Sequence, residues 1–456
     1  MPVKLVGSAL VPHAVVSGVT AAALGVAVRS PAAVAAGFAG AFLAADNLRR
    51  IGAVDGGFSR AFGPGWAQRV PDPLQPSGAS WGWPARLPPV PEPRWTQDVE
   101  FAAVPGTDRR LLADLWQPAP EVRCSGTAIV YLHGSAWYLM DKDVLTRPLF
   151  GQLAGQGHVV MDVAYRLCPQ TDVVGMVADA KRAVVWLKAN AAALGARADR
   201  VVLLGASAGG HVALLAAYAP NHPELTPEDV QGRDASVAAV ASFYGVPDLR
   251  AYGEHTTARL ADRPTGPATA RREPGRVRRW LDERMLGRPL TAAQSPPTPS
   301  HRQMMRDMVG GMPQEVPERY DLLSPISHVD PACPPTLLLH GEHDSTVPVT
   351  SVRHLHATLQ ACGVPSVYDE FPGAEHAFDL FYPPLAAPAA RVALRDLLRF
   401  LACVPAEPSA QAAGSGDRAD LARRAWGLHA AGPVQTPRQR AKRDQRESRA
   451  RRRGRA

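Results

Sequence analysis

Two serines in the chain lie in the pattern G-x-S-x-G, in which a serine hydroxyl can act as a nucleophile. Ser207 is at the centre of GASAG, residues 205–209, and Ser80 is at the centre of GASWG, residues 78–82. Ser207 follows an apolar run typical of a buried strand and precedes an apolar stretch typical of a helix. Ser80 lies between prolines, with neither a strand before it nor a helix after it. The surroundings therefore favour Ser207 as the nucleophile.

A nucleophilic serine of this kind needs a sharp turn between its strand and its helix, because that turn exposes the hydroxyl. The serine takes an unfavourable backbone conformation there, and small residues two positions before and after it let strand and helix approach closely. Gly205 and Gly209 occupy these positions. The alternatives are a glycine-rich turn with an ordinary serine and a phosphate-binding loop, but the segment has neither G-x-G-x-x-G nor G-K-[ST].

A serine hydroxyl is a weak nucleophile, so it needs a base, usually a histidine that is oriented by a carboxylate. In a strand–turn–helix arrangement of this kind the three groups follow in the order serine, acid, histidine. We predict Asp344, a few residues beyond the apolar run 335–341, as the acid and His376, on a later loop, as the base. Glu342 lies closer to its strand and Asp379 lies beyond the histidine, so both are weaker candidates for the acid.

Attack on a carbonyl carbon places negative charge on the oxygen, which preorganised N–H groups must stabilise. The turn His133–Trp137, HGSAW, follows a strand-like apolar run and is in place to provide such groups. We predict the backbone N–H groups of Ser135 and Ala136 as donors, together with that of Ala208, directly after the nucleophile. His133 is expected to stabilise the turn by hydrogen bonds.

The central part of the chain consists of continuous apolar runs, most of them separated by helical stretches. Strands without polar alternation are buried on both faces, so this order predicts an α/β fold with a mostly parallel sheet and helices on both sides. Two shorter runs joined by PGTD indicate an antiparallel hairpin that opens the sheet. An amphipathic helix, 390–402, follows the last strand. The predicted strands are residues 99–104, 111–116, 127–132, 158–165, 200–205, 237–245, 335–341 and 366–373.

The alternation of strands and helices stops between the runs 237–245 and 335–341. Residues 250–322 are rich in arginine and proline, and a structureless loop of this length is unusual in a compact domain. We therefore predict a small, partly helical cap, inserted into a domain that covers residues 97–404. The cap contains flexible, apolar methionines, which are expected to line or cover a substrate pocket, with ordinary helix packing as the alternative. These are Met304, Met305, Met308 and Met312.

Residues 1–48 are largely apolar, and the stretch Leu5–Val28 has no charged residue. As a helix this stretch would be about 36 Å long, enough to cross a bilayer. Residues 29–31 interrupt it, and the second apolar run, to residue 45, is too short to span comfortably alone. We predict a membrane anchor; a soluble helical hairpin and a cleaved signal peptide are the alternatives. The proline-rich residues 49–96 are predicted to be a linker or an arm over the surface.

The net charge of +8 lies at the end of the chain. Residues 433–456 contain ten Lys or Arg and two acidic residues, without the apolar periodicity that a core requires. We predict that residues 405–456 are a disordered basic tail with generic attraction to acidic lipid or polymer, and no specific nucleic-acid partner. The five cysteines have no C-x-x-C spacing, so neither a disulfide framework nor a zinc site is expected.

Five segments in order resemble motifs of the α/β-hydrolase superfamily and, within it, of the esterases related to hormone-sensitive lipase. They are YLHGSAWYLMDKD, VAYRLCPQ, GASAGGH, LLLHGEHDSTVP and FPGAEHAF, and the resemblance covers roughly residues 97–403. His133 and Gly134 match the start of the family's H-G-G-G motif. Ser135 and Ala136 stand where the family usually has glycines, which leaves less room for bulky or tertiary-alcohol esters.

The resemblance implies hydrolysis of carboxylic esters without a cofactor, through an acyl-enzyme intermediate. Our leading hypothesis is a membrane-associated carboxylesterase or lipase that acts on small-molecule or lipid esters with short- to medium-chain acyl groups. An amidase similar to arylformamidases is the alternative on the same fold, because the same three residues cleave activated amides. A catalytically silent, membrane-bound binding protein is the alternative of another class. The oligomeric state is left open.

Overall fold

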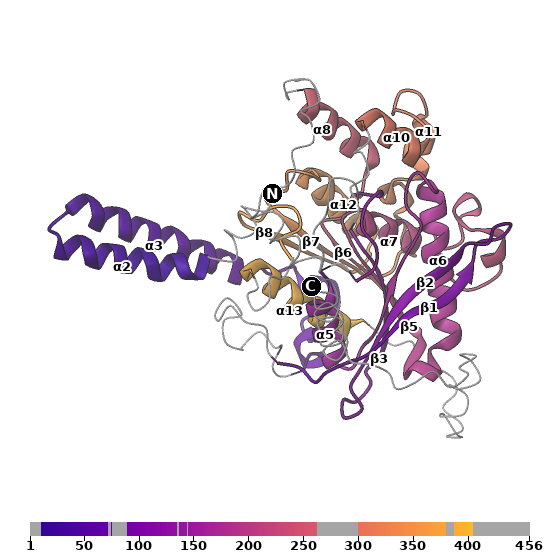
Figure 1. Ribbon diagram of the computed structural model, residues 1–456, viewed down its shortest axis with the longest axis horizontal. Coiled ribbons are helices and arrows are strands. Elements are labelled where there is room, and N and C mark those ends of the chain that lie inside the picture. The colour runs from indigo at the N-terminus through magenta and orange to yellow at the C-terminus, as the bar shows by residue number, and fades with distance from the viewer. Residues whose placement is uncertain are drawn as a thin grey trace, which may run out of the picture.

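The computed structural model describes residues 11–71, 74, 89–134, 136–143, 145–261, 300–379 and 387–404. The predicted basic tail, the second serine motif around Ser80 and the predicted donor Ser135 lie outside these residues. The eight described strands form a single sheet in the order β1-β2-β4-β3-β5-β6-β7-β8 (Figure 1).

The sheet is mostly parallel. Only the pairs β1/β2 and β2/β4 are antiparallel, and all other neighbouring strands run in the same direction. Leu132, Gly205 and Ser242 are in register across β3, β5 and β6, so the carboxyl ends of these strands meet at one edge. The strands are β1 (Arg94–Ala103), β2 (Arg110–Gln117), β3 (Gly126–Leu132), β4 (Val159–Val163), β5 (Ala196–Ala206), β6 (Ala239–Phe243), β7 (Thr336–Gly341) and β8 (Ser366–Phe371).

Helices cover both faces of the sheet, as the sequence predicted. One hydrophobic cluster joins the sheet to α6 (Val173–Asn190), α7 (Ala208–Tyr218) and α12 (Val349–Ala361). A second cluster joins the opposite face to α5 (Arg147–Gly155) and α13 (Pro388–Cys403). Every residue of β4, β6 and β7 is buried, which explains why their sequences lack polar alternation.

Three described helices lie between β6 and β7, where the cap was predicted. They are α8 (Leu249–Ala261), α10 (His301–Val309) and α11 (Pro317–Leu322). They lie together beyond the carboxyl edge of the sheet, at the top of Figure 1. Residues 262–299 lie outside the described part of the chain, so the full extent of the cap stays a prediction.

The N-terminal segment forms two antiparallel helices, α2 (Val11–Ala27) and α3 (Pro31–Gly52), that project away from the sheet (Figure 1). The longer helix is α3, whereas the sequence suggested that only the first apolar run was long enough to span. The difference arises because α3 continues through polar residues at its end, where Arg49 pairs with Asp46 and Ile51 is buried in the core. In the described part of the chain, α3 alone is long and apolar enough to cross a membrane by length and composition.

Part of the predicted linker is packed on the domain. Within it, α4 (Phe58–Phe62) and the 3₁₀ turn η1 (Trp66–Arg69) bury Phe58 and Trp66. Phe62 contacts Phe400 of α13, and the guanidinium of Arg399 lies 5.6 Å from the ring of Trp66. An amphipathic last helix would expose its outer face to solvent. In α13 that face is covered by this segment instead.

Candidate active site

Ser207 lies in a sharp turn at the carboxyl end of the central strand β5. β5 ends at Ala206 and α7 begins at Ala208, while Ser207 itself has φ +52° and ψ −118°. Residues other than glycine rarely adopt this backbone conformation, which costs about 1–3 kcal/mol and persists only where the surroundings impose it. The N–H of Ser207 donates to the carbonyl of Phe243 on β6 (2.9 Å), which holds the turn against the neighbouring strand.

The glycines on either side of Ser207 are required by close backbone approach. A Cβ atom on Gly205 would lie 2.2 Å from the carbonyl oxygen of Gly209. A Cβ atom on Gly209 would lie 2.0 Å from the carbonyl oxygen of Leu132 on β3. Any side chain at either position would therefore push the strand, the turn and the helix apart.

The structure brings Ser207, His376 and Asp344 together from three different loops. Oγ of Ser207 lies 2.9 Å from Nε2 of His376, and Nδ1 of His376 lies 2.7 Å from Oδ2 of Asp344. Asp344 follows β7, and His376 follows β8 at the edge of the sheet. These carboxyl ends lie on the same side as that of β5, so the parallel topology accounts for the meeting of residues far apart in sequence.

Asp344 is held as a buried carboxylate. Its Oδ1 accepts hydrogen bonds from the N–H groups of Thr346 and Val347, both at 2.8 Å. Burial alone would raise the pKa of Asp344. The hydrogen bond and the charge of His376, and to a smaller extent the charge of His340, outweigh burial, so the pKa of Asp344 is lowered. The carboxylate therefore stays ionised and faces Nδ1 of His376.

The two other acids considered from the sequence have different partners. Oε2 of Glu342 accepts from the N–H of Gly373 (2.8 Å). Asp379 is buried behind the histidine and accepts a hydrogen bond from the hydroxyl of Tyr244. The ring of Tyr244 in turn lies 4.6 Å from the ring of His376. Sequence reasoning missed Tyr244, because nothing in its local pattern shows that it faces a loop more than a hundred residues later.

The loop after β3 passes directly over the turn of Ser207. A Cβ atom on Gly134 would lie 3.4 Å from Cβ of Ser207. Ala136 and Trp137 both have positive φ, +47° and +60°, so this loop is strained over two consecutive residues. The N–H of Ala208 is in the first turn of α7 and has no acceptor within its own helix.

His133 starts this loop and is buried in a way that the sequence did not predict. Its ring packs against that of Tyr165 at a tilt of 31°, with the ring centroids 4.6 Å apart, and its carbonyl oxygen accepts a hydrogen bond from the hydroxyl of Tyr165 (2.7 Å). Within the described part of the chain, neither ring nitrogen makes a well-formed hydrogen bond. Burial lowers the pKa of His133 to about 4, so the ring is neutral and stabilises the turn by packing.

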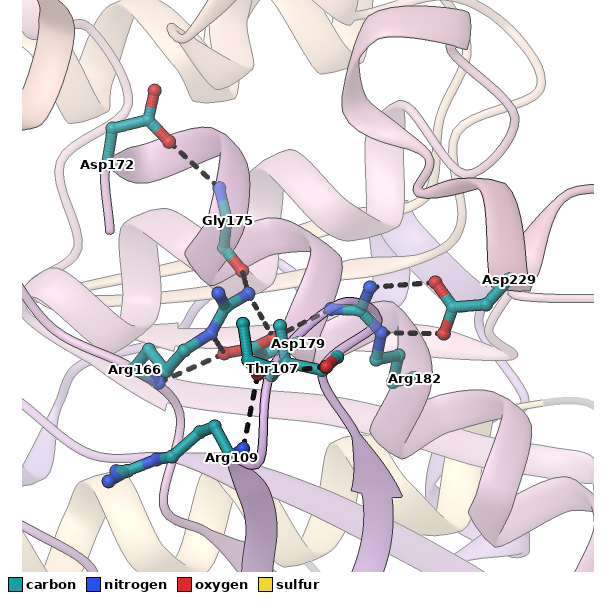
Figure 2. Close-up of polar contacts among 9 residues, drawn as sticks. Thr107, Arg109, Arg166, Asp172, Gly175, Asp179, Arg182 and Asp229 are labelled. Carbon is teal, nitrogen blue, oxygen red and sulfur yellow. Dashed lines mark hydrogen bonds and ion pairs between the residues drawn. The ribbon is translucent and has the colours of Figure 1, made fainter. Parts of the chain in front are cut away.

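A network of charged groups holds the loop that carries Tyr165 (Figure 2). Arg166, directly after Tyr165, donates from Nε and Nη2 to the two carboxylate oxygens of Asp179 on α6, both at 2.8 Å. Arg182 donates to the same carboxylate (2.9 Å) and forms a two-pronged contact with Asp229. Asp179 is fully buried, so its two arginine partners are needed to offset the cost of removing its charge from water.

The loop after β3 also contacts the cap helices. The hydroxyl of Tyr138 donates to Oδ2 of Asp307 on α10 (2.5 Å), and the ring of Trp137 packs edge-on against Tyr252 of α8 at 5.4 Å. Met305 and Met308 of α10 are fully buried in the core cluster, whereas the remaining two cap methionines are partly buried. This burial favours helix packing over pocket lining for Met305 and Met308.

Among the described residues, no group of His, Cys, Asp and Glu is arranged to hold a metal ion. All five cysteines are unpaired.

A mostly parallel eight-stranded sheet, with a serine turn after β5 and the acid and histidine loops after β7 and β8, defines the α/β-hydrolase class. The family model BD-FAE matches residues 114–298 and 289–359. The chain belongs to this family and to the α/β-hydrolase esterases related to hormone-sensitive lipase, as its motifs indicated.

Several relatives are named as ester hydrolases. Esterase LipQ of Mycobacterium tuberculosis is 30% identical over 346 residues, which cover 74% of this chain and 70% of LipQ. The probable carboxylic ester hydrolase LipM of the same organism is 31% identical over 277 residues, which cover 60% of this chain and 54% of LipM. A solved structure of Thermogutta terrifontis esterase 2, phosphonylated by sarin, is 24% identical with a TM-score of 0.48, covering 68% of this chain and 94% of that one. With 30% identity over 70% of LipQ, the chain is a carboxylic ester hydrolase.

Proposed function

We propose that the chain hydrolyses carboxylic esters through an acyl-enzyme intermediate on Ser207, with His376 as the base and Asp344 as the orienting acid. The observation that supports this most is the unbroken line of hydrogen bonds from Oγ of Ser207 through His376 to Asp344. The strained backbone of Ser207, which presents the hydroxyl at the carboxyl edge of the sheet, supports it independently.

In the first half of the reaction, Oγ of Ser207 attacks the ester carbonyl while its proton moves to Nε2 of His376. The resulting imidazolium is stabilised by Asp344 and returns the proton to the leaving alcohol, which departs and leaves the acyl group on Ser207. In the second half, water gives a proton to His376 as it attacks the acyl carbon. The bond to Oγ breaks, the proton returns to Ser207, and the free acid is released.

The negative charge that develops on the carbonyl oxygen needs N–H donors beside Ser207. We propose the N–H of Ala208, at the start of α7, and those of Ala136 and Ser135, on the loop that passes over the serine. The close approach of Gly134 to Ser207 supports this position for the loop. Glycine at 134 suits this position, because a Cβ atom there would lie 3.1 Å from the carbonyl oxygen of Ala206, directly before the serine.

We propose short- to medium-chain acyl groups as substrates. Trp137 of the donor loop and Tyr252 of α8 are both buried and their rings lie 5.4 Å apart, so large apolar side chains already fill this part of the contact between the loop and the cap. The full-length protein should therefore hydrolyse p-nitrophenyl acetate and butyrate faster than the palmitate ester. Faster hydrolysis of N-formylkynurenine than of any ester would favour the amidase alternative instead.

The nucleophile is tested by replacing each serine of the two G-x-S-x-G motifs. Ser207→Ala should abolish ester hydrolysis and labelling by a fluorophosphonate, whereas Ser80→Ala should leave both near wild type. Activity should also fall at acid pH, because a protonated His376 cannot accept the proton of Ser207. Labelling at Ser80 in the Ser207→Ala protein would contradict the proposal.

We also propose that residues 1–48 attach the enzyme to a membrane. Eight of the ten large apolar side chains that are exposed in the described part of the chain lie between Val16 and Leu43. Phe42 is 70% exposed, and α2 and α3 pack on each other through small residues: a Cβ atom on Gly37 would lie 2.4 Å from the backbone nitrogen of Ala22. Small residues at the contact and large apolar residues outside suit a helix pair in lipid.

Deletion of residues 1–48 tests the attachment. The full-length protein should sediment with membranes and need detergent for release, and the truncated protein should be soluble with nearly unchanged activity on a water-soluble ester. A full-length protein that is already soluble without detergent would exclude the anchor. An inactive truncated protein would mean that the segment is part of the catalytic fold, to which α3 is joined at Ile51.

A further inference from the structure

His211 lies on α7, one helical turn after Ser207, and is completely buried. The N–H of His211 donates to the carbonyl of Ser207 (3.0 Å), so the imidazole is carried by the same turn of backbone as the nucleophile. Neither the motif nor the proposed reaction gives this imidazole a role. A buried polar ring needs hydrogen-bond partners.

Both ring nitrogens of His211 are hydrogen-bonded. Nε2 lies 2.8 Å from the carbonyl oxygen of Leu323, which follows α11, and Nδ1 lies 3.2 Å from Nε1 of Trp137. A carbonyl oxygen can only accept, so Nε2 carries the proton and Nδ1 is the bare acceptor for the indole N–H. Burial lowers the pKa of His211 to about 4, which keeps the ring neutral and preserves both bonds at neutral pH.

Trp137 belongs to the strained loop that passes over Ser207. It follows Ala136, and both residues have positive φ, so the loop needs contacts that hold it in this conformation. The carbonyl of Trp137 accepts from the N–H of Cys168 (2.8 Å), on the loop that the Arg166 network holds. The indole Nε1–H of Trp137 donates to Nδ1 of His211 and so links this loop to the nucleophile helix.

We propose that His211 is a positioning residue that sets the distance between the loop bearing the proposed oxyanion donors and the nucleophile Ser207. Both nitrogens of the imidazole are engaged by Trp137 and Leu323, so neither is available for proton transfer in the reaction. Its bond to Trp137 joins the loop to α7, and its bond to Leu323 joins α7 to the end of α11. The inference rests on the proposed function, since it assumes that Ser207 and the N–H groups of this loop act together.

Three substitutions separate the two bonds of His211. His211→Asn places an amide oxygen near the position of Nδ1, so it retains an acceptor for Trp137 and loses the bond to Leu323. His211→Gln places its amide near the position of Nε2, so it retains the bond to Leu323 and loses the acceptor for Trp137. Trp137→Phe removes the indole donor and retains an aromatic ring against Tyr252.

We expect His211→Gln and Trp137→Phe to lower kcat by about 10- to 100-fold, because small displacements of oxyanion donors are costly in the transition state. Their KM for p-nitrophenyl butyrate should change much less. Affinity for a trifluoromethyl ketone, which forms an anionic tetrahedral adduct on the serine, should fall in parallel with kcat. His211→Asn should retain most of the wild-type kcat and most of the wild-type affinity for the ketone.

The control variant is His158→Gln, which replaces another buried imidazole. His158 lies directly before β4, and its Nδ1 lies 2.7 Å from Oγ of Ser125, directly before β3. It should change the unfolding temperature without changing kcat or the affinity for the ketone. If His211→Gln and Trp137→Phe behave like His158→Gln, or like wild type, the positioning role of His211 is wrong. If Ser207→Ala remains active or still binds the ketone covalently, the proposed function itself is what fails.

Discussion

Nδ1 of His376 lies 2.7 Å from Oδ2 of Asp344, and both side chains are almost completely buried. The carboxylate is held from its other oxygen by two backbone N–H groups of the loop that follows it. Such an arrangement fixes the imidazole in the tautomer that carries its proton on Nδ1, which leaves Nε2 free to accept the proton of Ser207.

Replacement of the acid should preserve the fold and remove most of the activity. Asp344→Asn retains the size of the side chain but not its charge, so it should lower kcat/KM by about 10³- to 10⁴-fold. Glu342→Gln is the matched control, because Glu342 lies two residues away and contacts Gly373 instead of His376. Kinetics on p-nitrophenyl butyrate measure both variants. An Asp344→Asn enzyme with activity similar to that of Glu342→Gln would assign the orienting role elsewhere.

Asp379 predicts a specific dependence of stability on pH. Burial raises its pKa to about 6, although the hydrogen bond from Tyr244 opposes this effect. In the unfolded chain the carboxyl group loses its proton near pH 4, so between about pH 4 and 6 the folded state retains a proton that the unfolded state has released. The contribution of Asp379 to stability is therefore fully present below about pH 4 and is lost as the pH rises towards about 6.

Urea unfolding of the wild type and Asp379→Asn measures this contribution. From about pH 4 to pH 7, the free energy of unfolding of the wild type should fall by about 2–3 kcal/mol relative to that of the variant, because asparagine does not titrate. Asp321→Asn, at an exposed carboxylate paired with Arg250, should show no such difference. Curves for wild type and Asp379→Asn that stay parallel over this range would show that Asp379 is not buried as a high-pKa acid.

The strands and the serine turn could be predicted from the sequence because their causes are local. Continuous apolar runs mark strands that are buried on both faces, and glycine at 205 and 209 marks a close approach within five residues. The positions of Asp344 and His376 followed from the same topology, since both come after predicted strands. The contacts of Tyr244 with Asp379 and of Trp137 with His211 join residues far apart in sequence, and no local pattern indicates them.

The segment after α3 shows a second limit of sequence reasoning. Glycines and prolines around Phe58 and Trp66 are typical of a linker, yet these aromatic residues are buried. They are buried against α13, more than 300 residues later. Arg399 of this helix lies over the ring of Trp66, and Phe400 contacts Phe62. An irregular segment packs in this way only when a distant helix offers an apolar face.

The cap methionines should differ in their effects. Met308 is completely buried, so Met308→Ser should lower the free energy of unfolding by about 2–4 kcal/mol without changing the preference among acyl chain lengths. Met312, which is only partly buried, should tolerate serine with a smaller loss. Chemical unfolding and a panel of p-nitrophenyl esters test both variants. A Met308→Ser enzyme of normal stability with an altered acyl preference would restore this residue to the pocket.

The antiparallel arrangement of α2 and α3 predicts how the proposed anchor crosses a membrane. α2 has 17 residues, about 25 Å of helix, and the turn to α3 contains Arg29, so a crossing pair would place Arg29 at the far surface. Arg49 would then lie on the same side as the catalytic domain. A cysteine at Arg29 or at Arg49, in a protein whose exposed Cys124 and half-buried Cys362 are replaced by serine, can be tested with a membrane-impermeant maleimide on sealed vesicles.

With the catalytic domain outside the vesicle, Arg49→Cys should react before the membrane is broken, and Arg29→Cys should react only after detergent is added. The reason is that the two helices pack along their length through Gly18, Gly37 and Ala41, so they must enter and leave the bilayer together. Immediate reaction at both positions would mean that the helix pair lies on the membrane surface without crossing it.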